Sequence, residues 1–160
     1  MAVDMFLKID DVKGESSDDA HKNEIDVISW AWGATQSGSA HMGGGAGAGK
    51  ANVQDLSVTK YIDKSSPALI KLCCSGQHFR SAKLTVRKAG GAPLEYVIIT
   101  LDEGLVASVS TGGTGERDRL TETVTLNFAK IKFEYTPQKA DGSKEPSIPV
   151  TFDIATNKIS

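Results

Sequence analysis

The feature that most constrains this sequence is the alternation of apolar and polar side chains, which recurs in segment after segment. Successive side chains of a β-strand point to opposite faces, so this period predicts strands with one buried face. The segments that show it are 3–9, 25–32, 56–62, 82–86, 97–109, 120–135 and 148–154. We therefore expect a mainly β fold, an antiparallel barrel or sandwich of two sheets with an extended glycine-rich loop at about 41–51.

Two of these segments change parity along their length. The apolar positions shift by one residue between Val27 and Ile28, and again near Ala129. A shift of one residue is what a β-bulge or a switch of sheet produces, and we expect bulges at both places. From Val97 to Val109 the apolar residues, Leu105 and Ala107 included, keep one parity.

One short flanking helix is expected at about residues 66–75. Ser66 is a suitable N-cap, and Pro67 fits the first helical position, where no backbone N–H is needed. Gly76 supplies the left-handed residue that ends such a helix.

Strand parity divides the side chains of the segment that contains Trp30 and Trp32 into two faces. Trp30 and Trp32 lie two residues apart on one face, where they either form a stacking platform for a ligand or fill the barrel core, and the core is favoured. The opposite face is small and polar. The expected core residues are Trp30, Trp32, Leu84, Val86, Ile99, Leu126 and Phe128.

Composition excludes several function classes. The 160 residues suit one domain, 1–160, and the net charge of −2 lacks the basic excess of a nucleic-acid-binding protein. No apolar run approaches the ~20 residues of a membrane span, so no membrane insertion is expected. The three histidines are widely spaced and Cys73 adjoins Cys74, so neither a zinc site nor a disulfide scaffold is predicted.

No catalytic motif is present, so we expect no catalytic residue, no cofactor and no enzyme activity. The run from Gly44 to Lys50 matches the beginning of a phosphate-binding P-loop. That motif needs a hydroxyl residue next, but Ala51 follows, and the subsequent residues alternate like a strand. The tract therefore predicts a flexible loop that a partner surface would order.

Many short motifs of the sequence resemble those of the haemolysin-coregulated protein (Hcp) family, the tube protein of bacterial type VI secretion. The resemblance covers about residues 1–142, and the last 18 residues depart from the pattern. The matching motifs are MAVDMF, DVKGES, EIDV, Trp30 with Trp32-Gly33, QSG, HMGGG, GAGK, NVQDL, TKYID, KLTVRKAGG, VSTGG and YTPQKADG.

The resemblance implies a structural subunit of homohexameric rings that stack into a hollow tube. The implied partners are a contractile sheath, a valine–glycine repeat spike protein and small effectors carried in the lumen. The tube would assemble in the bacterial cytoplasm and be secreted without a cleavable signal peptide. The N-terminal residues agree with this expectation, because they lack the basic region and the long apolar region of a signal peptide.

Two sets of residues acquire roles from this resemblance. The loop that reaches the next ring would contain His41, Met42, Gly43, Gly44, Gly45, Gly47, Gly49 and Lys50. The face opposite the tryptophans, Ser29, Ala31, Gly33 and Thr35, would line the lumen, although a solvent-exposed sheet face has the same residue types. The alternative function is a monomeric soluble β-barrel that binds a small ligand.

Overall fold

A computed structural model describes residues 3–37, 51–89 and 93–160 of the chain, and these form ten strands and one helix. The strands are β1 (Val3–Ile9), β2 (Ile25–Ala31), β3 (Ala34–Gln36), β4 (Ala51–Val53), β5 (Leu56–Tyr61), β6 (Phe79–Lys88), β7 (Leu94–Gly112), β8 (Thr121–Tyr135), β9 (Ile148–Asp153) and β10 (Lys158–Ile159). The helix is α1 (Ser65–Ser75).

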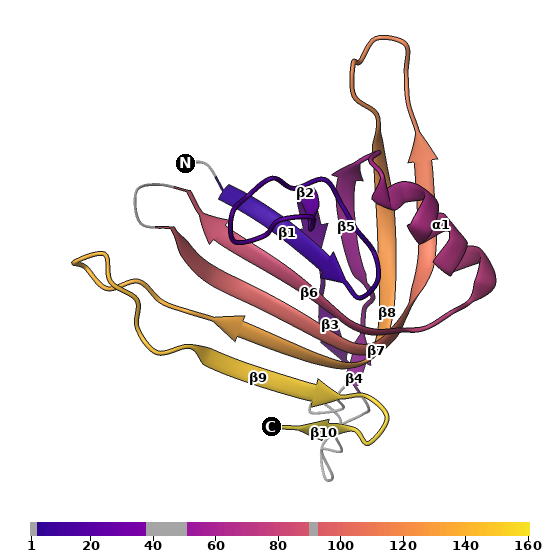
Figure 1. Cartoon of the computed structure of the whole chain (residues 1–160). Helices are drawn as coiled ribbons and strands as arrows, with labels where there is room; N and C mark the ends of the chain where they lie inside the picture. The colour runs from indigo at the N-terminus through magenta and orange to yellow at the C-terminus, as the bar shows by residue number, and fades with distance from the viewer. Residues whose placement is uncertain (1–2, 38–50, 90–92) are drawn as a thin grey trace.

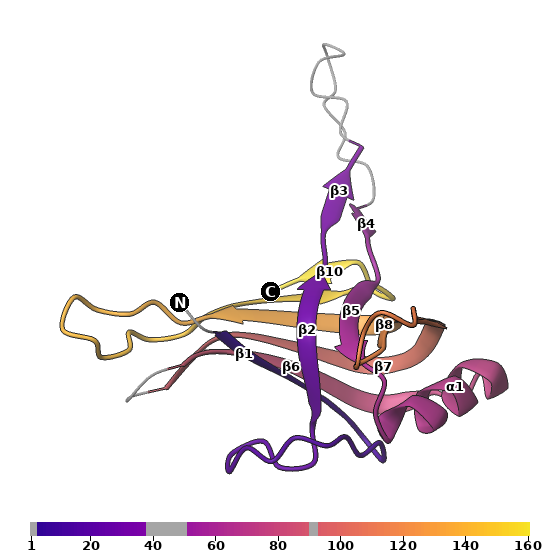
Figure 2. The same cartoon turned by 90° about the horizontal axis from the view of Figure 1, so that it is seen from above.

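Six of the strands close into an antiparallel barrel. The main sheet runs β10-β9-β8-β5-β2-β1-β6-β7, and a further pairing of β7 with β8 closes the six strands from β8 to β7, leaving β9 and β10 outside the closed part (Figure 1). Strands β3 and β4 form a separate two-stranded ribbon that projects away from the barrel (Figure 2). The expected fold class, a β-barrel with one short flanking helix, is confirmed.

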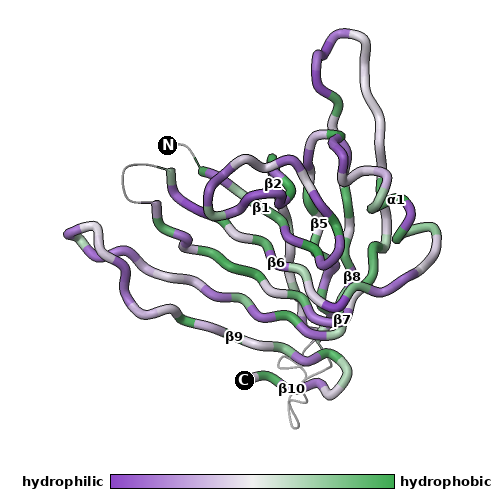
Figure 3. The backbone as a smooth tube through the Cα atoms, viewed as in Figure 1, coloured by the Kyte–Doolittle hydropathy of each residue, from purple (hydrophilic) through white to green (hydrophobic). Residues whose placement is uncertain are grey.

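The core lies inside this barrel, and apolar residues recur along its strands between polar ones (Figure 3). Leu84, Ile99 and Leu126 are completely buried, and Val86 and Phe128 are nearly so. Trp30 and Trp32 are only half-buried and pack against the edge of this core.

The two expected bulges have different outcomes. The register of β2 on β5 shifts between Val27 and Ser29, so the first bulge is confirmed. The second prediction is wrong, because Asp102 pairs with Lys130 and Gly104 with Phe128 in one unbroken register. The burial of β8 nevertheless changes parity at Ala129, where the strand leaves β5 and begins to pair with β9.

Strand β7 contains the irregularities that the apolar period does not reveal. Glu103 has a positive φ of 52°, and the register against β8 shifts between Val106 and Ser108. Val106 is therefore buried, whereas Ala107 is exposed. The expectation of one parity from Val97 to Val109 is wrong for this reason.

The helix begins one residue earlier than expected and is not capped by Ser66. Its N-cap residue is Lys64, which makes no side-chain capping bond, while Asp63 Oδ1 accepts a bond from the Ser65 N–H at 2.8 Å. Gly76 ends the helix at φ 67°, and its N–H donates to the Leu72 carbonyl, as the sequence predicts.

Candidate functional site: a hydroxyl face, two polar clusters and a groove

The small polar face predicted on β2 is part of a larger surface. Ser29, Ala31 and Thr35 are exposed and Gly33 is half-buried. Residues paired across an antiparallel sheet point to the same side, so the register extends the surface across β5, β8 and β7. One row is Ser29, Thr59, Thr123 and Ser110, and the next is Ala31, Ser57, Thr125 and Ser108.

We call these eight residues the hydroxyl face. Seven of them carry a hydroxyl group, none is charged, and all are exposed or half-buried. Sequence reasoning identified only Ser29 and Ala31, because the other members become neighbours through strand pairing alone. The surface offers neutral hydrogen-bonding groups without an apolar or charged anchor.

The glycine-rich tract lies outside the described residues. Its positions His41, Met42, Gly43, Gly44, Gly45, Gly47, Gly49 and Lys50 therefore receive no structural account. The ribbon that leads to the tract is described: Ala34 pairs with Val53 and Gln36 with Ala51, and β3 is exposed along its length.

A buried ionic cluster lies directly beneath the hydroxyl face. Lys60 and Glu122 occupy inward positions of β5 and β8, opposite each other, and the Lys60 Nζ lies 2.5 Å from Glu122 Oε1 and 3.1 Å from Asp63 Oδ1. Ser66 Oγ donates to the same Glu122 oxygen at 2.5 Å. Two buried charges are tolerated only when paired and hydrogen-bonded, so the cluster fixes the start of α1 against the barrel.

A second cluster holds the segment between β1 and β2. The His21 ring stacks on Phe6 with centroids 4.4 Å apart, and its nitrogens lie 3.0 Å from Glu24 Oε2 and 2.7 Å from Glu95 Oε1. Arg87 donates to both carboxylate oxygens of Asp18, at 3.0 and 2.7 Å. This bidentate pair lowers the pKa of Asp18 to about 2 and raises the pKa of Arg87.

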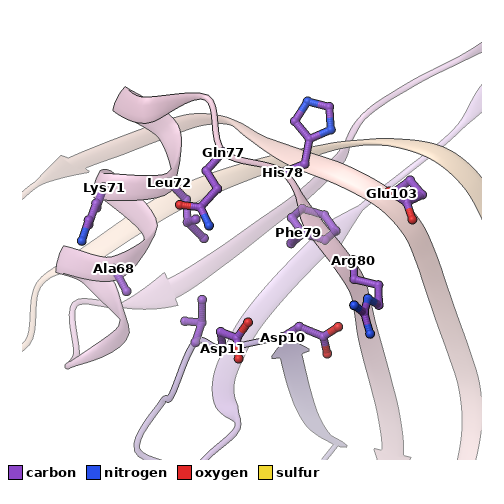
Figure 4. Close-up of a pocket in the computed structure, with 11 residues that line it drawn as sticks. Asp10, Asp11, Ala68, Lys71, Leu72, Gln77, His78, Phe79, Arg80 and Glu103 are labelled. Atoms are coloured by element: carbon purple, nitrogen blue, oxygen red, sulfur yellow. The ribbon is translucent and has the colours of Figure 1, made fainter.

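A pocket of about 830 Å³ forms a groove beside α1 (Figure 4). Asp10 and Asp11 lie at the bottom of this view, Phe79 and Arg80 come from β6, and His78 turns away. A smaller apolar pocket of about 130 Å³ is lined by Trp32 and five residues of β8, β9 and β10, but Trp30 does not line it.

Two kinds of site are not found within residues 3–37, 51–89 and 93–160. No three His, Cys, Asp or Glu side chains gather there in a way that would hold a metal ion. The one described helix is too short to cross a membrane.

Comparison with known proteins gives consistent matches. The family model described as "Type VI secretion system effector, Hcp" matches residues 6–135. Protein hcp1 of Pseudomonas aeruginosa is 68% identical over 146 residues, which cover 91% of this chain and 90% of that protein.

Solved structures show the same fold. A structure described as a type six secretion system protein matches with a TM-score of 0.93 and 34% identity, covering 99% of this chain and all of that one. Hcp1 from Salmonella typhimurium matches with a TM-score of 0.79 and 41% identity over the full length of both chains. The barrel, the match over residues 6–135 and the high identity agree, and the chain belongs to the Hcp family of type VI secretion proteins.

Proposed function

We propose that this chain is a structural subunit of the type VI secretion tube, and that it acts as a homohexameric ring that stacks into a hollow tube. The observation that supports this most is the hydroxyl face on a closed barrel of a member of the Hcp family. In this proposal the chain needs no catalytic residue and no cofactor.

The hydroxyl face lines the lumen in this proposal. Its residues are neutral and short, so they hydrogen-bond to water or to a polar cargo surface without holding it by charge or by apolar burial. Such a wall suits the passage of small folded effectors. Ala31 interrupts one row of hydroxyls, so a cargo contact at that position is apolar rather than hydrogen-bonded.

The ring-stacking surface is the glycine-rich tract, for which the β3–β4 ribbon provides a projecting base. Glycines allow the backbone of one ring to approach the next ring closely. Ordering such a tract costs conformational entropy, so each stacking contact is weak. Free rings therefore predominate in dilute solution, and stacks form when rings are concentrated or templated.

The remaining partners follow from the same proposal. Rings assemble in the bacterial cytoplasm inside a contractile sheath, with a valine–glycine repeat spike protein at the tip. Contraction of the sheath then expels the tube, so that the subunit leaves the cell without a cleaved signal peptide.

Electron microscopy of the purified full chain tests this proposal. We expect rings with a central opening in dilute buffer and end-to-end stacks when the protein is concentrated. The competing function, a monomeric ligand-binding barrel, requires single barrels in the same images, and that result would overturn the ring proposal.

A further inference from the structure

The groove beside α1 carries charges of both signs above an apolar floor. Its walls contain the carboxylates of Asp10, Asp11 and Glu103 and the cations of Lys71 and Arg80. Val12 and Phe79 are buried beneath them. The volume of about 830 Å³ lies within the range of about 300–1,000 Å³ typical of concave binding sites.

The charged side chains of this groove are available to a partner. Within the described part of the chain, none of these five groups forms an ion pair, and Asp11, Lys71, Arg80 and Glu103 are exposed. Asp11 and Glu103 both have a positive φ, 64° and 52°. Conformations of this kind are uncommon outside glycine, and here they place two carboxylates at the groove.

The same chain carries a projecting segment whose charges, like those of the groove, are of both signs. Residues 113–120 connect β7 to β8 at the end of a hairpin that extends beyond the barrel, and all of them are exposed (Figure 1). Charges alternate along it: Glu116, Arg117, Asp118 and Arg119. Arg119 is already stacked on Tyr61, its guanidinium carbon 3.6 Å from the ring centroid, which leaves the other three charges at the tip.

The tip contains a turn at Thr114. Thr114 organises its turn, because the Thr114 hydroxyl accepts from the Glu116 N–H at 3.4 Å and the Thr114 carbonyl accepts from the Arg117 N–H at 3.5 Å. A tip that already turns here loses less conformational entropy on binding than a fully extended loop would.

We propose that the 113–120 tip of one copy seats in the groove of a neighbouring copy and joins subunits around the ring. Arg117 faces Asp10 and Asp11, its aliphatic stem covers the apolar floor, and Asp118 faces Arg80. The tip and the groove are different patches of one surface, and a contact between different patches is the heterologous kind that closes a ring. The inference rests on the proposed ring function.

Charge reversal with rescue tests this contact in the full chain. Arg117→Glu and Asp10→Lys each place like charges opposite one another, so each variant should raise the protomer concentration needed for half-assembly by about tenfold or more. The double variant restores opposite charges and should recover most of the assembly. Native mass spectrometry over a dilution series measures the ring fraction.

Matched controls carry the same charge changes elsewhere. Lys139→Glu and Glu145→Lys alter exposed residues of the loop between β8 and β9, and both should assemble like the wild type. Circular dichroism confirms that every variant is folded.

The possible outcomes separate this inference from the ring proposal. Loss of rings in both single variants with rescue in the double variant supports the tip–groove contact. Rings that persist in the single variants, or a double variant without rescue, overturn the contact but leave the ring proposal intact. A wild-type chain without rings overturns both.

Discussion

Lys60 of β5 and Glu122 of β8 are paired on adjacent strands and both point into the barrel, with both side chains fully buried and Nζ 2.5 Å from Oε1. The pair is enclosed with Ser66 and Asp63 at the start of α1, so it couples two strands to the helix. Breaking such a pair leaves an uncompensated buried charge, whereas removing both charges does not.

We therefore expect Lys60→Met to lower the free energy of unfolding by about 3–5 kcal/mol. The double variant Lys60→Met/Glu122→Leu should be markedly less destabilised than the single one. Urea unfolding at one fixed protomer concentration measures both. A double variant as unstable as the sum of its two single variants would show that the charges do not act as a pair.

Acid stability depends on Asp18 in a defined direction. Its pKa is lowered from 3.8 to about 2 by the hydrogen bonds from Arg87, so the folded state favours the ionised carboxylate. The stabilisation is fully present above about pH 4 and is lost as the pH falls through about 2. Asp18→Asn should therefore melt below the wild type at pH 7, and the two melting temperatures should converge near pH 2. Asp19→Asn, at an exposed neighbouring position, should match the wild type; a pH-independent gap for Asp18→Asn would contradict this prediction.

Gly104 is required by close packing at the middle of β7. A Cβ at this position would overlap the Asn127 carbonyl oxygen and the Phe79 ring. Gly104→Ala should cost about 1–3 kcal/mol, because backbone and ring must move apart. Gly112→Ala, at the end of the same strand, meets nothing within 4 Å and is the matched control. Equal unfolding midpoints for the two variants would disprove the packing argument.

Alternation predicted the six barrel strands well because each of them has one face on a common core. It failed in β7, where the positive φ of Glu103 and the shift near Ala107 change which residues face inward. Apolar periodicity does not reveal either irregularity: Asp102 and Glu103 interrupt the pattern without favouring a parity, and Leu105, Val106 and Ala107 are apolar on both faces. Ser66 likewise satisfied the sequence rule for a cap, but its hydroxyl bonds to Glu122 of a distant strand.

Which residues share a candidate surface depends on strand register, which the sequence alone does not reveal. Ser29 and Ala31 could be assigned to one face from β2 alone, whereas Thr59 and Thr123 joined them only through pairing. Lys60 and Glu122 did carry a sequence signal, because each is a charged residue at an inward position of an alternating strand. That signal marks a buried charge but does not identify its partner.

The glycine-rich tract provides a test of stacking that is separate from ring formation. Replacing Gly45 and Gly47 with tryptophan should leave the native mass of the ring unchanged but abolish tubes and secretion, because bulky side chains prevent close backbone approach. Secretion is measured as the protein in the culture supernatant. Lys50→Ala should leave nucleotide binding absent, as in the wild type. Normal secretion by the Gly45/Gly47 variant would exclude the tract from stacking.

The native mass of the full chain decides whether it forms a homohexamer. Native mass spectrometry at micromolar protomer concentration, without nucleotide or metal, should give a single assembly of six times the 17.0 kDa subunit. A predominant species of 17.0 kDa under the same conditions would contradict the homohexamer.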